Sequence, residues 1–172
     1  MNYEFQLQLT RLMNYVVQIE LERENGMPLC FKEDGGRFIE PQTLKMCVDT
    51  SYRIRVLCKE QLEMVTMLVN RMTVFLFPRN SARDYKVFEG IFKSEGIPVT
   101  RKIQRDIFSV HLPLDDETML GVALQCKYYK RTSQNGCSGG TPLKNIIVNY
   151  RVEEDETVKV TGLKYRKIAP RW

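Results

Sequence analysis

The sequence from Leu120 to Val152 decides the fold, because it contains two runs with the periodicity of pleated strands. The first run, LGVALQCKYY (120–129), places an apolar or aromatic side chain at every second residue, and the second, LKNIIVNYRV (143–152), does so from Ile146 onward. Side chains of a strand alternate between its two faces, so each run has one apolar and one polar face. The pattern predicts two strands that each cover one side of a hydrophobic core, as antiparallel strands do.

The segment KRTSQNGCSGGTP (130–142) connects these two runs. Its Asn135-Gly136 and Gly139-Gly140 pairs tolerate positive φ angles, and Pro142 favours a return to extended chain. The segment is too long for a tight hairpin. We therefore expect a crossover or a surface lobe here.

Runs of the same kind recur along the chain between turn signals such as Asp34-Gly35-Gly36 and Ser94-Glu95-Gly96. Those that we predict to be strands cover residues 5–21, 29–32, 43–48, 51–58, 73–77, 85–93 and 107–114. Residues 59–72 fit either a short helix or an irregular strand, with a turn at Asn70-Arg71. This spacing predicts an all-β fold, an antiparallel β-sandwich or barrel. We find no internal repeat or linker, so we expect one domain over residues 1–172, with a basic C-terminal tail from about residue 164.

Composition places the chain among ordinary globular proteins, with 172 residues of which 43% are hydrophobic and 27% charged. No run has the roughly 18 to 20 apolar residues that cross a bilayer, and the N-terminus lacks the pattern of a signal peptide. We therefore expect a cytoplasmic protein. The net charge of +5 is unevenly placed, since residues 1–100 are balanced and the excess lies in residues 101–172. The basic tail could meet an acidic peptide, an anionic membrane or nucleic acid, or simply be a solvated end.

The groups that could perform catalysis or hold a metal are few. The five cysteines form no CxxC pair and mostly adjoin apolar runs, which predicts buried free thiols. His111 is the only histidine, so a zinc site is not expected. No motif of a thiol hydrolase supports a Cys137 and His111 dyad, the GCSGGTP segment lacks the lysine of a phosphate loop, and the acidic residues 115–117 supply too few ligands for calcium. The sequence thus predicts neither an enzyme nor a cofactor.

Basic and aromatic residues on the polar faces of otherwise apolar strands are the candidate contacts for a partner. They are Arg53, Arg55, Lys127, Tyr129 and Arg151. We expect them to receive a short peptide that is acidic or ends in a carboxylate. The alternation of Lys127, Tyr129 and Arg131 also fits a nucleic-acid surface, but three residues are a weak signal and nucleic acid is not expected.

Several segments, in the same order along the chain, resemble the cannabinoid receptor-interacting protein family. Residues 31–38, FKEDGGRF, are similar to its aromatic, Lys, any, Asp-Gly, any, Arg-Phe motif, and TLK (43–45) and SYRIRV (51–56) follow at matching distances. Further similar positions are Gly90, Phe92, Ser94, Glu95, Gly96, Thr100, Lys127, Tyr128, Tyr129, Cys137, Gly140, Thr141 and Pro142. The similarity covers about residues 9–165; residues 59–83 match less well, the last loop is longer, and the basic tail has no counterpart.

This resemblance implies a β-sandwich like the immunoglobulin-like domain of Rho GDP-dissociation inhibitors, without catalytic chemistry. It also implies a cytoplasmic adaptor, placed at the inner face of the plasma membrane by its partner or its basic tail. That partner would be the C-terminal tail of a G-protein-coupled receptor, whose signalling or trafficking the adaptor modulates. The alternative is a binder of a lipid chain between the sheets, or a regulator of a small GTPase in membrane trafficking.

Overall fold

The structure is a computed structural model that describes residues 13–59, 62–80, 84–115, 117–132, 137 and 139–170. The described residues form strands and connecting segments, and no helical segment among them could cross a bilayer. The strands are β1 (Met13–Arg23), β2 (Cys30–Glu33), β3 (Gln42–Cys47), β4 (Ser51–Cys58), β5 (Thr66–Val69), β6 (Met72–Phe75), β7 (Phe77–Arg79), β8 (Lys86–Lys93), β9 (Asp106–Pro113), β10 (Met119–Tyr129), β11 (Thr141–Val152) and β12 (Val158–Lys167). The predicted all-β class is therefore confirmed, whereas the two separate sheets of the predicted immunoglobulin-like sandwich are not formed, because the strands join into one sheet.

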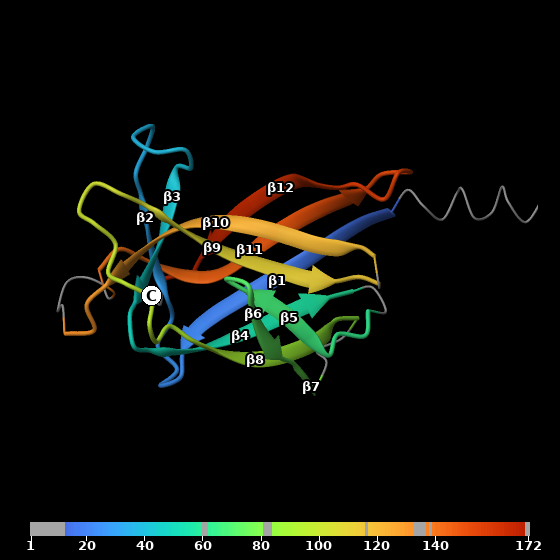
Figure 1. Cartoon of the computed structure of the whole chain (residues 1–172), viewed down its shortest axis with the longest axis horizontal. Coiled ribbons are helices and arrows are strands. Elements are labelled where there is room, and N and C mark those ends of the chain that lie inside the picture. Colours follow the sequence, from blue (N-terminus) through green and yellow to red (C-terminus); the bar gives the residue numbers. More distant parts are fainter. Residues whose placement is uncertain are drawn as a thin grey trace, which may run out of the picture.

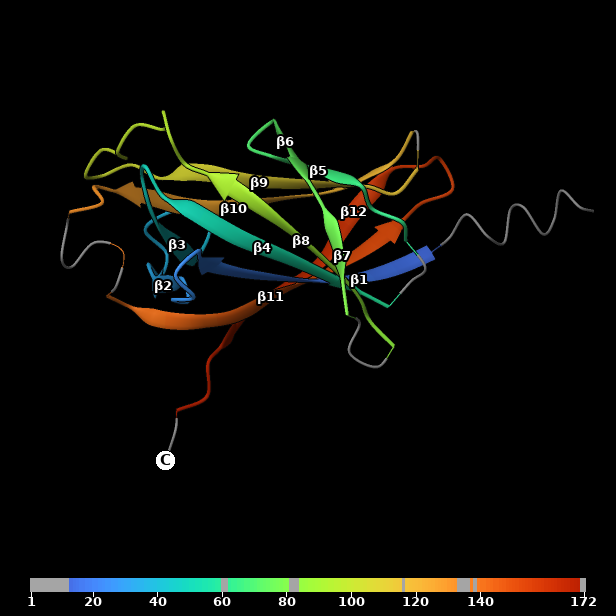
Figure 2. The same ribbon diagram turned by 90° about the horizontal axis from the view of Figure 1, so that it is seen from below.

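All twelve strands belong to one mixed sheet that curls almost into a barrel (Figures 1 and 2). Eleven of them follow the order β6-β5-β9-β10-β3-β2-β11-β1-β4-β8-β7, and β12 pairs with β11 beside this path. Every pair is antiparallel except β3 with β10, which are parallel. The prediction of purely antiparallel pairing was wrong at this place, because hydrophobic alternation is the same in both directions of a strand.

The two ends of this sheet meet at a seam beside Gly90. β6 and β7 lie at opposite ends of the strand order, yet only Leu76 separates them in the chain. A Cβ atom on Gly90 would lie 2.6 Å from Val74 Cγ1 and 2.8 Å from the Phe75 carbonyl oxygen. Only glycine permits this close approach of backbones, so Gly90 is what allows the curled sheet almost to close.

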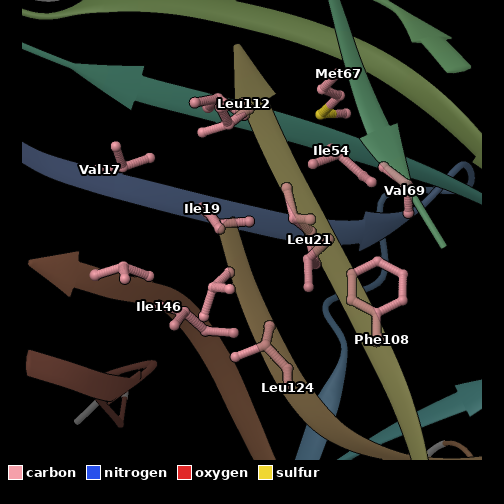
Figure 3. Packing of buried hydrophobic residues seen from close by; sticks show 14 of the residues in the cluster. Val17, Ile19, Leu21, Ile54, Met67, Val69, Phe108, Leu112, Leu124 and Ile146 are labelled. Atoms are coloured by element: carbon pink, nitrogen blue, oxygen red, sulfur yellow. The ribbon is translucent and has the colours of Figure 1, made fainter. Parts of the chain in front are cut away.

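The two runs that decided the fold are β10 and β11, and their apolar faces point into the interior as predicted. The core-facing residues of β10 (Leu120, Val122, Leu124, Cys126 and Tyr128) and of β11 (Ile146, Val148, Tyr150 and Val152) are all buried. Side chains from both sides of the barrel fill the interior (Figure 3). This packing gives no support to a lipid chain held between the layers.

The connection between β10 and β11 is a crossover, as predicted. β10 pairs with β9 and β3, whereas β11 pairs with β1, β2 and β12. Gly140 has a φ of 109°, and a Cβ atom there would lie 2.8 Å from the Phe31 carbonyl oxygen. The Asn135-Gly136 pair lies outside the described residues, as do residues 5–12 of the predicted N-terminal strand.

One segment was ambiguous in the sequence, and another differs from its predicted structure. The ambiguous segment before Pro78 is strand and not helix, since β5 and β6 form a hairpin whose turn at Asn70-Arg71 was predicted and has φ angles of 48° and 66°. The predicted basic tail is a strand up to Lys167, because β12 pairs with β11 along its length. The alternation of apolar and polar residues in β12 was hard to recognise, because an irregularity near Gly162 shifts the register between β12 and β11.

The cysteines also differ in part from prediction. Cys47 and Cys137 form a disulfide, with their Cα atoms 5.9 Å apart and a sequence separation of 90, so they are not free thiols. Cys30, Cys58 and Cys126 are buried, as expected, and do not take part in the disulfide. Burial raises the pKa of Cys126 to about 12, so this thiol stays protonated at neutral pH.

Candidate functional site: a basic cluster at one end of the barrel

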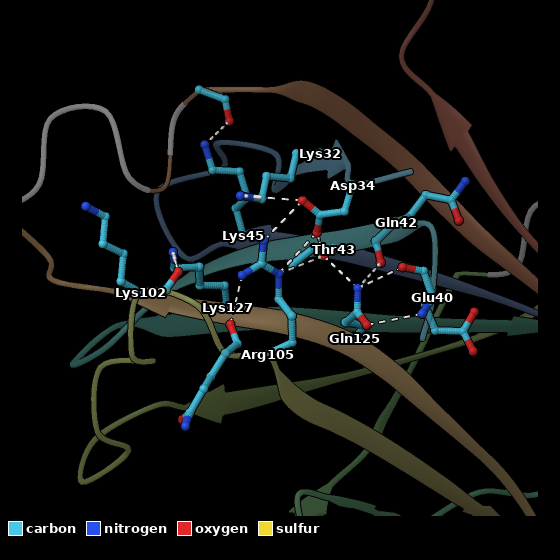
Figure 4. Close-up of polar contacts among 12 residues, drawn as sticks. Lys32, Asp34, Glu40, Gln42, Thr43, Lys45, Lys102, Arg105, Gln125 and Lys127 are labelled. Carbon is cyan, nitrogen blue, oxygen red and sulfur yellow. Dashed lines mark hydrogen bonds and ion pairs between the residues drawn. The ribbon is translucent and has the colours of Figure 1, made fainter. Parts of the chain in front are cut away.

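A cluster of basic side chains lies where the β2–β3 hairpin adjoins β10 and the segment before β9 (Figure 4). The parallel pairing sets Lys127 of β10 directly opposite Lys45 of β3. β2 adds Lys32, which is opposite Thr43 of β3. We call Lys32, Lys45 and Lys127, together with Tyr129, the lysine site. It exists because the β2–β3 hairpin and β10, which is distant from that hairpin in sequence, place their cations side by side.

A buried ion pair between Arg105 and Asp34 holds this end of the barrel together. Arg105 donates from Nη2 to Asp34 Oδ1 and from Nε to Oδ2, both at 3.1 Å, and the two side chains are only 8% and 6% exposed. The hydroxyl of Thr43 also donates to Asp34 Oδ2, and the guanidinium carbon of Arg105 lies 3.9 Å from the centre of the Phe38 ring. Burial opposes ionisation of Asp34, but the hydrogen bonds from Arg105 and Thr43 outweigh it and lower the pKa of this carboxyl.

The Arg105 side chain is buried although the segment before it, residues 101–104, is exposed. Gln125 completes the same polar cluster, since its amide nitrogen donates to the Glu40 carbonyl and to the Thr43 hydroxyl, both at 2.9 Å. The side chains of Asp34, Thr43, Arg105 and Gln125 thus all have hydrogen-bond partners within this cluster, as buried polar groups in proteins usually do. The cluster fixes the β2–β3 hairpin against β10 and so positions the lysine site.

Tyr129 lies between two lysine ammonium groups in the lysine site. Its ring centre is 5.3 Å from Lys45 Nζ and 5.2 Å from Lys127 Nζ, within the range of cation–π contacts. Lys45 Nζ donates to the Gly139 carbonyl at 2.5 Å, and Lys127 Nζ donates to the Lys102 carbonyl at 3.4 Å. Within the described parts of the chain, no carboxylate forms an ion pair with Lys127.

Among the described residues, Asp34 is the carboxylate that pairs with the lysine site: its Oδ1 lies 3.6 Å from Lys32 Nζ and also pairs with Arg105, so this one carboxylate faces several cations. Burial, followed by the nearby charges of Lys32, Arg105 and Lys102, lowers the pKa of Lys127. Burial, together with Lys32, also lowers the pKa of Lys45, although Cys30 opposes this shift. Because like charges disfavour protonation of these amines, an anion that arrives here would relieve the repulsion. The site therefore has the electrostatics of an anion receptor.

The predicted contacts Arg53 and Arg55 lie together on β4, on the other side of the barrel, and carboxylates surround them. Arg53 is 2.7 Å from Glu22 and 3.2 Å from Glu89. Arg55 is 2.8 Å from Glu89, 3.4 Å from Glu22 and 3.7 Å from Glu20. The hydrogen bond to Glu89 raises the pKa of Arg55. These arginines are thus largely neutralised by neighbouring strands.

The structure brings together only part of the predicted contact set. Lys127 and Tyr129 belong to the lysine site, whereas Arg151 of β11 pairs with Glu153 at 2.9 Å near the start of β12. Sequence reasoning missed Lys32, Lys45 and Arg105. The one signal for Lys32 and Lys45 was the FKEDGGRF and TLK motifs, which also contain Asp34, Phe38 and Thr43 but do not reveal that these residues converge with β10.

The potentially reactive groups have structural surroundings. Cys137 is in a disulfide, and His111 covers Gly121, where an added Cβ atom would lie 2.7 Å from the imidazole Cδ2. Asp115 accepts hydrogen bonds from the backbone amides of Glu117 and Thr118, as in an ordinary turn. No group of three or more possible metal ligands occurs in the portion of the chain that is described.

Fold and site together define a class: an all-β protein that presents an unbalanced basic surface at one end of a filled barrel. Comparison with known proteins then gives the family. The family model for CB1 cannabinoid receptor-interacting protein 1 matches residues 12–165, so the chain belongs to this family, as its motifs predicted.

The similar curated proteins are distant in sequence. The mouse CB1 cannabinoid receptor-interacting protein 1 is 25% identical over 152 residues, which span 87% of this chain and 91% of the mouse protein. The human and bovine proteins of the same name are 24% identical over the same lengths. The similarity thus extends over nearly the whole of both chains.

Proposed function

We propose that this protein is a non-catalytic adaptor that binds the cytoplasmic C-terminal tail of a G-protein-coupled receptor and modulates the receptor's signalling or trafficking. The relatives are named for interaction with the CB1 cannabinoid receptor, which makes a receptor of this kind the natural partner class. The proposal places the protein in the cytoplasm, at the inner face of the plasma membrane when it is bound. It assigns no chemical step to the chain, in keeping with the structural surroundings of His111 and Cys137.

The observation that carries the proposal is the lysine site. A peptide that ends in a carboxylate offers an anion for Lys127 and an extended chain that can lie across the Tyr129 ring. Such charge-assisted hydrogen bonds are among the stronger polar contacts in proteins. The arginines of β4 offer less, because a carboxylate arriving there would compete with Glu22 and Glu89. We therefore place the peptide on Lys127 and Tyr129, with the buried Lys45 contributing positive charge from behind them.

The test is isothermal titration of the protein with a synthetic receptor-tail peptide, prepared with a free and with an amidated C-terminus. We expect Lys127→Glu to weaken binding about tenfold or more, because it removes one charge-assisted contact and adds repulsion. Lys164→Glu, on the exposed face of β12, is the matched control for net charge and should change affinity little.

Two results would contradict the placement. One is equal loss of affinity for Lys127→Glu and Lys164→Glu, which would mean that only overall charge matters. The other is a larger loss for Arg53→Glu with Arg55→Glu, which would move the peptide to β4. Amidation of the peptide should weaken binding only if the terminal carboxylate is the recognised group. Buried side chains fill the interior, which gives no support to a lipid chain between the layers, and no contact of the described residues points to a small GTPase.

A further inference from the structure

Two isoleucines at the loop end of the barrel are the most exposed large hydrophobic residues that the structure describes. Ile39, in the β2–β3 hairpin, is 97% exposed, and Ile103, in the segment between β8 and β9, is 80% exposed. Large aliphatic side chains that are fully exposed on ordered loops usually mark an interaction site when they cluster. These two residues belong to different loops, which only the tertiary structure brings to the same end of the barrel.

The Arg105 cluster brings these loops together. Ile39 follows Phe38, whose ring contacts the guanidinium of Arg105, and Ile103 lies two residues before Arg105. Both loops extend from the same end of the barrel (left in Figure 1). The lysine site adjoins them, because Lys127 donates to the carbonyl of Lys102.

Both loops are held in shape by their own hydrogen bonds. The Asp34 amide donates to the Pro41 carbonyl at 2.7 Å across the hairpin, and Glu40 exchanges backbone hydrogen bonds with the side chain of Gln125. The Gln104 amide donates to the Arg101 carbonyl at 3.0 Å. The isoleucines therefore project from fixed backbone.

The surroundings of the isoleucines are strongly basic. Segments 32–41, 99–105 and 127–131 contain eight Lys or Arg and three Asp or Glu, a surplus equal to the net charge of the whole chain. One of the three acids, Asp34, is buried in its ion pair with Arg105. Arg37, Arg101 and Lys102 are exposed beside the isoleucines. We call these three residues together with Ile39 and Ile103 the loop rim.

We propose that the loop rim binds the surface of an anionic lipid membrane directly, with Ile39 and Ile103 inserted among the headgroups. Basic residues are attracted to the negative potential of anionic lipids, and aliphatic side chains gain by leaving water for the acyl boundary. The isoleucines project from two loops beside exposed basic residues, which suits insertion among the headgroups of an anionic lipid interface. This inference goes beyond receptor-tail binding and does not depend on it.

The test is co-sedimentation of the full chain with vesicles of phosphatidylcholine alone or with about one third phosphatidylserine. We expect binding to the anionic vesicles only. Ile39→Asn with Ile103→Asn should weaken it about tenfold or more, since the insertion is lost. Arg101→Glu with Lys102→Glu should weaken it about twentyfold or more, because each basic residue near an anionic surface contributes roughly fivefold.

Matched controls change equivalent residues elsewhere. Val65→Asn alters a side chain that is 70% exposed on another part of the barrel, and Lys144→Glu with Lys164→Glu makes the same change in net charge on β11 and β12. We expect both control variants to bind vesicles nearly as the unaltered protein does. Equal losses in the control and loop-rim variants would overturn the proposal in favour of unspecific charge attraction.

Insertion of the loop rim into the membrane can be measured separately from binding, by tryptophan fluorescence. Ile39→Trp, introduced together with Trp172→Phe, places the only tryptophan of the chain on the loop rim. Its fluorescence should shift to the blue with anionic vesicles and be quenched by brominated lipids. No vesicle binding, or binding without this shift, would overturn the proposal. If the chain binds the acidic receptor-tail peptide but no vesicles, the loop rim is part of a protein interface and the proposed function still stands.

Discussion

The arginine surface of β4 and the lysine site on β3 and β10 look alike in sequence and behave oppositely in the structure. Each has basic residues on the polar face of a half-apolar strand. Arg53 and Arg55, however, have Glu22, Glu20 and Glu89 opposite them on β1 and β8, whereas Lys127 has Lys45 opposite it. The comparison teaches that the neighbour across the sheet, set by strand order and register, decides whether a charged face stabilises the fold or remains available to a partner.

The largest loss of stability should follow from breaking the ion pair that positions the lysine site. Arg105→Ala leaves the buried carboxylate of Asp34 without its main partner, and removing one member of a buried ion pair typically costs about 3 kcal/mol or more. We expect urea unfolding to show a loss of this size. The same measurement on Arg79→Ala, whose side chain is 56% exposed and 3.5 Å from Glu89, should show a loss under about 1 kcal/mol. Similar losses for both variants would mean that the Arg105 pair is no more important than a surface contact.

An intermediate loss of stability is expected when the arginine surface of β4 is altered. Burial opposes the charged form of Glu89, but the hydrogen bond and charge of Arg55 outweigh it and lower its pKa below the ordinary value of 4.5. A lowered carboxylate pKa contributes stability that is present above pH 4.5 and is lost as the pH falls through the folded-state value. Glu89→Gln should therefore cost about 1 to 2 kcal/mol at pH 7.

The pH dependence is the control for this prediction. The difference in unfolding free energy between the unaltered protein and Glu89→Gln should shrink when urea unfolding is repeated below pH 4. A difference that stays constant between pH 7 and pH 3 would show that the charge of Glu89 is not what stabilises this surface.

The smallest change in stability, and the only gain among these predictions, is expected at the lysine site. Burial and neighbouring cations lower the pKa of Lys127 from 10.5, so its charged form is disfavoured in the folded protein. Lys127→Met should accordingly raise stability at pH 7 by about 0.5 kcal/mol while weakening peptide binding. Urea unfolding and titration of the same variant measure both quantities.

Proton linkage also predicts that replacing Lys127 raises stability at pH 7. With a lowered lysine pKa, the unfolded chain holds more protons between the folded-state pKa and 10.5, so stability rises with pH over that interval. The advantage of Lys127→Met should shrink as the pH is raised through this interval. A Lys127→Met variant that is less stable than the unaltered protein at pH 7 would show that Lys127 stabilises the fold, contrary to this prediction.

Much of the fold was predictable because it depends on local alternation. β4 begins and ends at its predicted residues, and β10 and β11 bury the predicted faces. β12 was missed because one irregularity breaks its period. The parallel pairing of β3 with β10 was missed because alternation carries no direction, and the Cys47–Cys137 disulfide because its members lie 90 residues apart.

The candidate site was less predictable than the fold. Lys127 and Tyr129 were identified from their own strand, but Lys45 is buried on β3 and Arg105 follows a loop that resembles many exposed ones. Their roles depend on contacts between segments that are 20 to 90 residues apart, such as Asp34 with Arg105 and Lys45 with Lys127. A pattern within one strand cannot report such contacts.

The sequence by itself determined the strand class of the chain, the buried face of most strands and, through its ordered motifs, the family. These properties follow from alternation and local spacing, which each segment carries independently of the others. Only the tertiary structure decided which basic residues are neutralised and which are crowded together, and which exposed isoleucines share one end of the barrel. The physical reason is that electrostatic and packing energies depend on distance in space, and strand order and register set that distance.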